Sequence, residues 1–360
     1  MRPSASRVVG WGIVGPGKIA HRFAEVATKH PGARLAAVQG RDAARAQAFA
    51  DAWRVDGGAP AVHTDLDALL RDPGVDAVYV ATPHAFHADA VRRALEAGKP
   101  VLCEKSLTPN AALTRELCAL SQARGVFLME AVWTRFLPAW TQVGAWLAAG
   151  AIGAVRGIQS SFCFDPPYDA GSRLFDPAQA GGAMLDLGVY NLSMTQWVLQ
   201  RALGTCPPLA RMDVDGTLAP TGVEQRVAAT LVFEGGIASQ FQCGLDGRAP
   251  NTLQVLGERG HIVVCARFWE ATRVELYVGD APPVVVETRA TINGFEGEVE
   301  EAMRCIAEGR VESATMPHAD SIVVAGWMDT IRARLGVPDP FQPDPFQPDP
   351  FKPDPFRAAG

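Results

Sequence analysis

The first stretch of the chain whose residue types and spacing could do chemistry is a glycine-rich turn. It reads Gly12-Ile-Val-Gly15-Pro-Gly17-Lys-Ile-Ala20 and stands between a predicted strand and a predicted helix. Gly15 permits a tight turn, Gly17 lets a pyrophosphate approach the backbone, and the small Ala20 allows close contact between helix and strand. The phosphates would lie at the positive end of the helix. A glycine turn with only a structural role is the alternative. We predict a dinucleotide site with the contacts Gly15, Pro16, Gly17, Lys18 and Ile19.

The run after the second predicted strand bears on which dinucleotide is bound. It reads Val38-Gln-Gly-Arg41-Asp42-Ala-Ala-Arg45. An acidic residue there suits the ribose hydroxyls of NAD, whereas arginine suits the additional phosphate of NADP. Arg41 and Arg45 are four residues apart, so both can face one phosphate from the start of a helix. Asp42 is either a helix N-cap or a ribose ligand, and Arg45 is alternatively a solvated helix residue. We predict NADP as the cofactor, with NAD as the alternative.

Strands and helices alternate in the part of the chain that must position these turns, from residue 7 to about residue 132. Strands are predicted over residues 8–14, 35–39, 77–81, 101–104 and 126–130. Helices are predicted over residues 18–29, 42–53, 85–97 and 110–124. Such alternation implies parallel strands with crossover helices. The expected fold class is α/β, with a doubly wound Rossmann sheet over residues 1–132.

The pattern changes after Pro138, and residues 133–337 are expected to form a second domain. Helices are predicted over residues 139–149, 182–200, 295–308 and 320–335, and an extended segment over 155–164. Further strands alternate polar and apolar residues with period two, as in the run from Arg273 to Val278, which is typical of antiparallel strands. We expect an α+β domain with a large open sheet, mainly antiparallel. The outer face of that sheet could pack against a twin subunit, giving a homodimer or homotetramer.

Composition and charge exclude several classes of protein. The chain has 360 residues, of which 48% are hydrophobic and 20% charged, as in a folded protein of about two domains. Lys+Arg of 33 against Asp+Glu of 39 gives a net charge of -6, which excludes a generally basic nucleic-acid or membrane-surface binder. No apolar run is long enough to span a bilayer and no signal-peptide core precedes the first strand, so we expect a cytoplasmic protein. The seven cysteines are scattered, which predicts neither a disulfide framework nor a zinc site.

The last residues, 338–360, repeat the unit Pro-Asp-Pro-Phe four times. Proline at this density excludes helix and sheet and predicts an extended, polyproline-like segment. We expect a disordered appendage. Docking of the four phenylalanines on a groove of this or another protein is the alternative.

Several further motifs follow one another in a fixed order. They are Val78-Tyr-Val-Ala81-Thr82-Pro83-His84-Ala-Phe-His87, Gly98-Lys-Pro-Val-Leu-Cys-Glu104-Lys105, Leu128-Met-Glu-Ala-Val-Trp133-Thr-Arg135-Phe, Ser172-Arg-Leu-Phe-Asp176 and Gly181-Gly-Ala-Met-Leu-Asp186-Leu-Gly-Val-Tyr190. In this order and spacing the chain resembles the glucose–fructose oxidoreductase/inositol dehydrogenase (Gfo/Idh/MocA) family over about residues 7–337. Within the family it is most similar to the branch of dimeric dihydrodiol dehydrogenase, NADP-dependent D-xylose dehydrogenase and aldose–aldose oxidoreductase.

The resemblance implies the catalytic residues. The family's Glu-Lys-Pro motif falls on Glu104, Lys105 and Ser106, which makes Lys105 the lysine near the nicotinamide and the substrate hydroxyl. A second motif places Asp186 and Tyr190 on the helix after a double glycine. Ser106 stands where the family has proline, and because proline restrains its own backbone and that of the preceding residue, the serine predicts a looser loop around Lys105.

The chemistry gives an independent reason for these residue types. Oxidation of a hydroxyl requires a base for its proton while hydride leaves the same carbon, and free tyrosine, with a pKa of about 10, is too weakly ionised near neutrality. An ammonium group such as that of Lys105 would lower the pKa of Tyr190. Asp186, four residues before Tyr190, would share its helical face and orient substrate or hold Lys105. The alternative is that Tyr190 packs and Asp186 is an ordinary helix charge.

Other residues of the quoted motifs are assigned by the same resemblance. His84 and His87, with Thr82, are expected in the cofactor pocket, with surface histidines as the alternative. A pair without a third ligand is a poor zinc site, and no metal is predicted. Glu104, Trp133 and Arg135 are expected near the nicotinamide, although the last two could pack the joint between domains. Arg173 is expected to contact substrate, with a surface ion pair as the alternative.

Taken together, these residues predict an NADP-dependent oxidoreductase that acts on a cyclic sugar, converting an aldose such as D-xylose or D-glucose to its lactone. Conversion of a trans-dihydrodiol to a catechol is the alternative within the same family. An aromatic pocket would favour the dihydrodiol and a pocket rich in hydrogen-bonding groups would favour the sugar. A dinucleotide-sensing regulator without turnover is the alternative outside enzymes.

Overall fold

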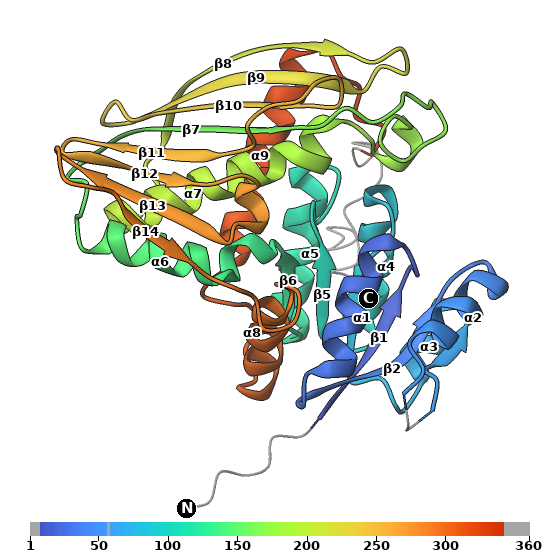
Figure 1. Ribbon diagram of the computed structural model, residues 1–360. Helices are drawn as coiled ribbons and strands as arrows, with labels where there is room; N and C mark the ends of the chain where they lie inside the picture. The colour runs from blue at the N-terminus through green and yellow to red at the C-terminus, as the bar shows by residue number, and fades with distance from the viewer. Residues whose placement is uncertain (1–7, 56–57, 342–360) are drawn as a thin grey trace, which may run out of the picture.

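The computed structural model describes residues 8–55 and 58–341. Two domains lie one above the other, each built on its own sheet (Figure 1). The chain of the N-terminal domain runs through six strands, which are Val9–Val14 (β1), Ala33–Gln39 (β2), Ala61–His63 (β3), Ala77–Val80 (β4), Val101–Glu104 (β5) and Leu128–Ala131 (β6). Their order in the sheet is β3-β2-β1-β4-β5-β6 and all neighbours are parallel. The predicted doubly wound sheet is thereby confirmed.

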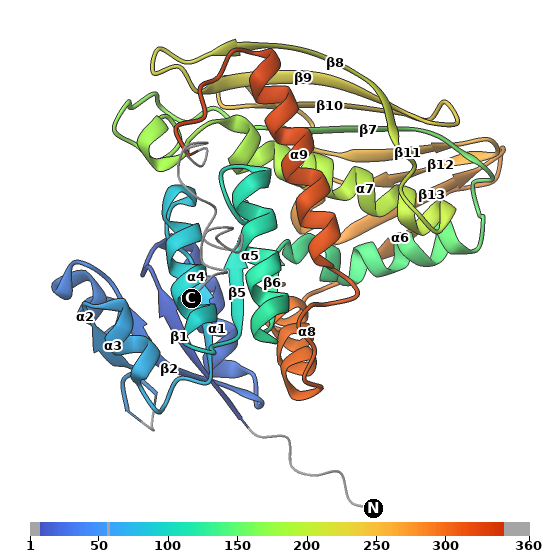
Figure 2. The same ribbon diagram turned by 180° about the vertical axis from the view of Figure 1, so that it is seen from behind.

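Helices cover both faces of this sheet (Figures 1 and 2). They are Lys18–Lys29 (α1), Ala43–Ala52 (α2), Leu66–Arg71 (α3), His87–Glu96 (α4) and Ala111–Arg124 (α5). Apolar residues of α1 and α2 belong to one core, and those of α3, α4 and α5 to a second core across the sheet. Ala20, Phe23 and Ala27 of α1 are completely buried, which is the helical spacing of one apolar face. Because β1 and β4 are neighbours whose helices cover opposite faces, a crevice is expected at their carboxyl ends.

The segment around β3 and α3 is the part of this domain that the sequence pattern did not predict. β3 has only three residues and forms the edge of the sheet, beside β2. A strand of that length is too short to show alternation. α3 has six residues and begins at Asp65, whose side chain accepts a hydrogen bond from the backbone N–H of Ala68.

The C-terminal domain is an eight-stranded sheet with helices on one face. Its strands are Val155–Cys163 (β7), Leu209–Leu218 (β8), Glu224–Phe233 (β9), Ala238–Gly244 (β10), Leu253–Gly257 (β11), Gly260–Val264 (β12), Arg273–Val278 (β13) and Val284–Glu287 (β14). The order is β14-β13-β12-β11-β7-β10-β9-β8, antiparallel except for β7 with β10, as expected for a mainly antiparallel sheet. The helices are Pro138–Ala148 (α6), Val189–Leu203 (α7), Glu296–Ala307 (α8) and His318–Arg334 (α9). Figures 1 and 2 show α6, α7 and α9 against the sheet, and α8 lower, beside the N-terminal domain.

The outer face of the large sheet is polar and open. A shallow depression of about 630 Å³ lies on it, lined largely by polar side chains that include Gln159, Gln240, Gln242 and Gln254. These residues alternate along their strands with buried apolar ones such as Ile158 and Val255. The packing of a twin subunit on this face stays a prediction.

Most of the Pro-Asp-Pro-Phe tail lies outside the described residues, which end at Phe341. Its described beginning contacts the N-terminal domain, because the side-chain amide of Asn110 donates to Asp339 at 2.9 Å. The ring of Phe341 packs against the main apolar core. The first repeat is therefore in contact with the folded chain.

Two further features of the described chain bear on its class. Over residues 8–55 and 58–341, no helix combines the length and the apolar character that crossing a membrane requires. All seven cysteines are free thiols, and five of them are buried among packed residues.

Candidate active site

The glycine-rich turn lies at the crevice between β1 and β4. Gly15 has φ +94°, and a Cβ on it would lie 3.0 Å from the backbone of Ala81 and Thr82, so only glycine fits. Gly17 precedes α1, and a Cβ there would meet only the carbonyl oxygen of Ala81, at 3.9 Å. No side chain of the described residues caps α1. Its first N–H groups are thus available to an anion, as the dinucleotide prediction requires.

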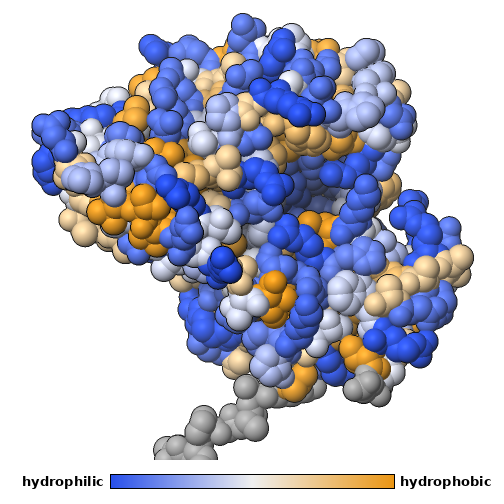
Figure 3. All heavy atoms as spheres, viewed as in Figure 1, coloured by the Kyte–Doolittle hydropathy of each residue, from blue (hydrophilic) through white to orange (hydrophobic). Residues whose placement is uncertain are grey.

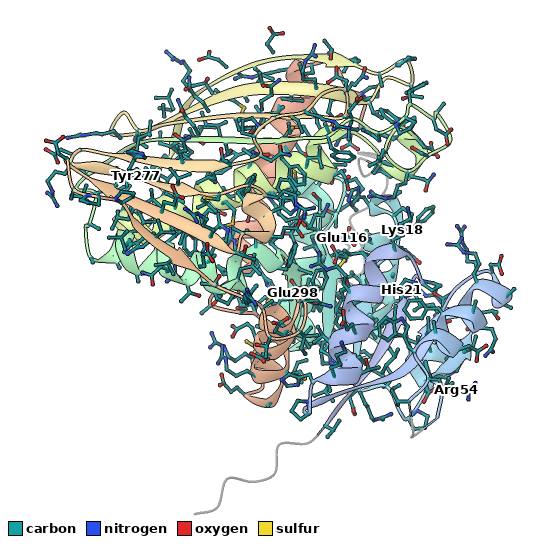
Figure 4. All side chains as sticks on the ribbon, in the orientation of Figure 1. Lys18, His21, Arg54, Glu116, Tyr277 and Glu298 are labelled. Carbon is teal, nitrogen blue, oxygen red and sulfur yellow. The ribbon has the colours of Figure 1, made fainter. Side chains whose placement is uncertain are left out.

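The crevice also carries a polar atom that suits a cofactor. The hydroxyl of Thr82, directly after β4, is buried and has no hydrogen-bond partner among the described residues. Figure 3 shows this face of the molecule hollowed between the two domains, with hydrophilic residues around the hollow. Lys18 lies at the upper, cleft end of α1, whereas Arg54 lies at the far end of the domain (Figure 4). The unpartnered hydroxyl, the uncapped helix and the open space at Gly17 fit a nicotinamide dinucleotide.

The arginines predicted to select the cofactor are both exposed at the start of α2. Asp42 is the N-cap of this helix, and its carboxylate accepts the backbone N–H of Arg45 at 3.0 Å. It is therefore engaged with the helix rather than turned toward a ribose. The guanidinium of Arg41 lies over the ring of Phe86, 5.4 Å from its centroid. Phe86, exposed in the turn His84–Phe86 after β4, is a neighbour of the cofactor crevice that sequence reasoning missed.

The two histidines are buried behind this turn and do not lie on the surface. The ring nitrogens of His87 are 2.9 Å from the carbonyl oxygen of Ser106 and 2.7 Å from that of Thr82. His87 therefore lies between the loop after β4 and the loop after β5. His84 lies 3.1 Å from the carbonyl oxygen of Ala180, and burial, followed by the charge of Lys105, lowers its pKa to about 3. Within the described residues no group of His, Cys, Asp and Glu is placed to hold a metal ion.

Lys105, Asp186 and Tyr190 come together at the boundary between the domains. The ammonium nitrogen of Lys105 is 2.7 Å from the backbone oxygen of Asp186 and 3.3 Å from its carboxylate. It lies 5.1 Å from the ring centroid of Tyr190. Arg173 pairs with the same carboxylate at 2.9 Å, with 54% of its side chain exposed. The predicted residues thus form one cluster, in which Asp186 holds Lys105.

The backbone at Asp186 departs from the predicted helix. Met184–Gly188 forms a single π-helical turn, and α7 begins only at Val189. A π turn is wider than an α turn and occurs often at functional sites. Both Asp186 and Tyr190 nevertheless reach Lys105, the first from the π turn and the second from α7.

The electrostatics of the cluster correct one expectation. Burial would raise the pKa of Asp186, but the positive charges of Lys105 and Arg173 outweigh it and hold this pKa below its usual range. Tyr190 behaves in the opposite way, because burial and then the charge of Glu104 raise its pKa well above 10. The net shift of the pKa of Tyr190 is therefore upward, opposite to the one expected from the charge of Lys105 alone.

Aromatic side chains border Tyr190, and most of them escaped the sequence analysis. The indole N–H of Trp133 donates to the hydroxyl of Tyr190 at 3.2 Å. The ring of Phe162 lies 5.7 Å from that of Tyr190 and stacks on Trp269 with centroids 3.4 Å apart. Phe295 lies 5.0 Å from Trp133 on its other side. We call Trp133, Phe162, Trp269 and Phe295 the aromatic wall.

Arg135 is the predicted site residue that the structure does not bring to the cleft. Its side chain is completely buried, and one guanidinium nitrogen lies 2.6 Å from the carboxylate of Asp320. The other nitrogens donate to Ser193 and Gln196 of α7. Since every nitrogen of the group is engaged inside the C-terminal domain, the expectation of a cofactor contact is wrong for Arg135.

Glu104 and Ser106 flank Lys105 and are both buried. The carboxylate of Glu104 accepts a hydrogen bond from the hydroxyl of Tyr79 beneath the cleft, and burial raises the pKa of Glu104. Its contact with the cofactor stays a prediction. Ser106 is only 1% exposed, and its hydroxyl donates to the carbonyl oxygen of Leu185 at 3.0 Å. The looser loop expected from the absence of proline is therefore not found.

Comparisons with known proteins identify the family of the chain. The model of an oxidoreductase family with an NAD-binding Rossmann fold, GFO/IDH/MocA, matches residues 9–132, and the GFO/IDH/MocA C-terminal domain matches residues 140–263. A trans-1,2-dihydrobenzene-1,2-diol dehydrogenase of Mus musculus is 35% identical over 339 residues, which cover 92% of this chain and 98% of that protein.

Two solved structures are similar over nearly the whole chain. A 3-ketoreductase from Actinomadura kijaniata, in complex with NADP and TDP-benzene, has a TM-score of 0.77 and 26% identity over 90% of this chain and 97% of its own. An aldose–aldose oxidoreductase from Caulobacter crescentus has a TM-score of 0.79 at 22% identity, covering 92% and 98%, and shows the shared fold. With both family models matched in order, the chain belongs to the GFO/IDH/MocA family and is an oxidoreductase that uses a nicotinamide dinucleotide.

Proposed function

We propose that the protein is an NADP-dependent dehydrogenase that oxidises a trans-dihydrodiol of an aromatic ring to a catechol. The observation that carries the proposal is the aromatic wall, whose members Trp133 and Phe162 lie directly beside Tyr190. A flat unsaturated ring packs well on aromatic faces, whereas a sugar needs many hydrogen-bonding partners. The mouse relative, named as a dihydrodiol dehydrogenase, supports the same substrate class.

The chain supplies the proton transfer. A bound nicotinamide would accept the hydride that leaves the carbinol carbon. The indole N–H of Trp133 can only donate, so the oxygen of Tyr190 accepts from it and keeps its own proton for the substrate side. In oxidation, Tyr190 as phenolate takes the hydroxyl proton of the diol. Lys105, held by Asp186, places a positive charge beside that phenolate.

Oxidation of an aldose to its lactone is the second candidate. Several hydrogen-bonding groups lie near Tyr190, namely those of Lys105, Asp186 and Arg173. The side chain of Arg173 is about half exposed. The related 3-ketoreductase was solved with a TDP ligand, which supports a polar substrate for the family. We favour turnover over a regulator without turnover, because a regulator has no need of the grouping in which Lys105 lies 3.3 Å from the carboxylate of Asp186 and 5.1 Å from the ring centroid of Tyr190.

The test is reduction of the nicotinamide by the purified protein with trans-1,2-dihydrobenzene-1,2-diol, D-xylose and D-glucose in parallel. We expect kcat/KM for the diol to exceed that for either aldose by about tenfold or more, since one aromatic contact contributes about 1.4 kcal/mol. The Tyr190→Phe variant, purified identically, measures the background. Turnover of an aldose alone would replace the diol by a sugar, and turnover of none of the three would refute both candidates.

The choice of NADP over NAD depends on Arg41. We expect Arg41→Ala to raise the Kd for NADP about tenfold, because a charge-assisted hydrogen bond to the additional phosphate contributes roughly 1.5 kcal/mol. The Kd for NAD should change less than about twofold. Calorimetry with both dinucleotides measures this. Arg54→Ala, which removes another exposed arginine just after α2, is the control. Equal weakening of NAD and NADP would contradict the role of Arg41.

A further inference from the structure

Ser106 connects the two domains at the catalytic cluster. It directly follows Lys105 in the loop after β5, in the N-terminal domain. Its hydroxyl donates to the carbonyl oxygen of Leu185 at 3.0 Å, and Lys105 donates to the next carbonyl, that of Asp186, at 2.7 Å. Two neighbouring residues of one domain thus bind two consecutive carbonyls of the π turn in the other.

The position of Ser106 is also determined from its second side. Its own carbonyl oxygen lies 2.9 Å from a ring nitrogen of the buried His87, at the start of α4. With 1% exposure, the residue makes these contacts away from water, where a hydrogen bond is stronger and an unpaired partner costs more. A proline at this position would restrict the backbone but could not donate to Leu185, because it has no side-chain donor.

We infer that Ser106 is a positioning residue of this enzyme. Its hydroxyl fastens the loop that carries Lys105 to the π turn that carries Asp186, and so sets where the ammonium group lies relative to Tyr190. In this chain a hydrogen bond between domains provides the restraint that a proline ring would give within the loop. The inference rests on the proposed function in one respect, which is the role of Lys105 and Tyr190 in proton transfer.

The test compares Ser106→Ala with the same substitution at another buried serine that donates to a backbone carbonyl. Ser121 is also completely buried, and its hydroxyl donates to the carbonyl oxygen of Val126 in the same domain, away from the cluster. We expect Ser106→Ala to lower kcat about five- to tenfold, the effect of one hydrogen bond, with the KM for NADP changed less than about twofold. Ser121→Ala should leave kcat unchanged, and Ser106→Thr, which keeps the hydroxyl, should recover most of it.

A second measurement needs no substrate. The side chain of Lys105 is 12% exposed, and amine labelling followed by mass spectrometry reports how firmly it is held. We expect its labelling rate, relative to the exposed Lys29, to rise several-fold in Ser106→Ala and to stay unchanged in Ser121→Ala. The inference would be overturned if Ser106→Ala kept both the wild-type labelling rate of Lys105 and the wild-type kcat. It would also be overturned if Ser106→Ala and Ser121→Ala changed these two quantities equally. If the wild type turns over no substrate, the proposed function fails, and the labelling of Lys105 alone supports or overturns the role of Ser106.

Discussion

Replacing Tyr190 by phenylalanine is expected to lower kcat by about a hundredfold to ten-thousandfold, the range for removal of a general acid–base group. The substitution deletes one oxygen. The ring keeps its contact with Phe162 and its place in α7, so the fold and the crevice should persist. The Kd for NADP should change less than about twofold, because the glycine-rich turn predicted to hold the phosphates lies between β1 and α1. Steady-state kinetics with the preferred substrate and calorimetric titration with NADP measure the two effects.

The same residue determines the pH dependence. Burial and the charge of Glu104 raise the pKa of Tyr190 well above 10, so only a small fraction is phenolate at neutral pH. Oxidation requires the phenolate, and its rate should therefore rise with pH throughout the neutral and alkaline range. Reduction uses the phenol, and its rate should stay flat near neutrality. The rise of the oxidation rate with pH should be absent from the residual activity of Tyr190→Phe.

A matched control comes from the far end of the large sheet. Tyr277 lies on β13, at the opposite side of the molecule from the cleft (Figure 4), and its hydroxyl donates to Glu275. Tyr277→Phe deletes the same atom and should retain wild-type kcat and pH profile. Normal turnover by Tyr190→Phe, or an equal loss in the two variants, would show that another group transfers the proton.

Much of the N-terminal domain could be predicted from the sequence because its signals are local. The glycine turn requires positive φ at Gly15, and α1 shows its buried face as a run of apolar residues at helical spacing. The short β3 shows no such pattern, because its three residues are held by pairing with β2. The π turn at Met184–Gly188 was also out of reach, since its apolar residues fit a plain helix equally well.

The residues of the candidate site also fall into those that the sequence could predict and those that it could not. Lys105, Asp186 and Tyr190 could be assigned through motifs, and the structure brings them within contact. The stack of Phe162 on Trp269 joins β7 to the turn before β13, and no local pattern links two such distant residues. The pKa of Tyr190 also depends on burial by both domains, which outweighs the one charge that sequence reasoning considered.

Arg135 shows most clearly how a motif position can mislead. It follows Trp133 by two residues, and the indole N–H of Trp133 does reach the hydroxyl of Tyr190. Trp133–Phe136 is a short 3-10 helix, and residues two apart on such a helix do not share a face, so the two side chains leave it on different sides. Arg135 enters the interior between α7 and α9 and pairs with Asp320. Its role is therefore predicted to be stability, which makes the ion pair a sharp test.

Substituting alanine for Asp320 is expected to lower the free energy of unfolding by about 3–5 kcal/mol, because it leaves a buried guanidinium without its counter-charge. The side chain of Asp320 is 5% exposed, and it also accepts a hydrogen bond from Gln200 at 2.8 Å. Denaturant titration of the wild type and the variant, in the presence and absence of NADP, measures the loss. Asp320→Asn, which keeps the size and part of the hydrogen bonding, should lose less than the alanine variant.

Replacing both partners separates a structural role from a role in binding. In Arg135→Met/Asp320→Leu no buried charge remains, so most of the lost stability should return, since apolar residues of similar volume often replace a buried pair without cost. The double variant should also bind NADP with wild-type affinity, because Arg135 does not reach the crevice. Glu308→Ala, which breaks an exposed pair with Arg304, is the control and should change stability little. Weakened NADP binding in a stable double variant would return Arg135 to the cofactor site, and an unfolding free energy unchanged by Asp320→Ala would show that the buried pair does not hold the domain together.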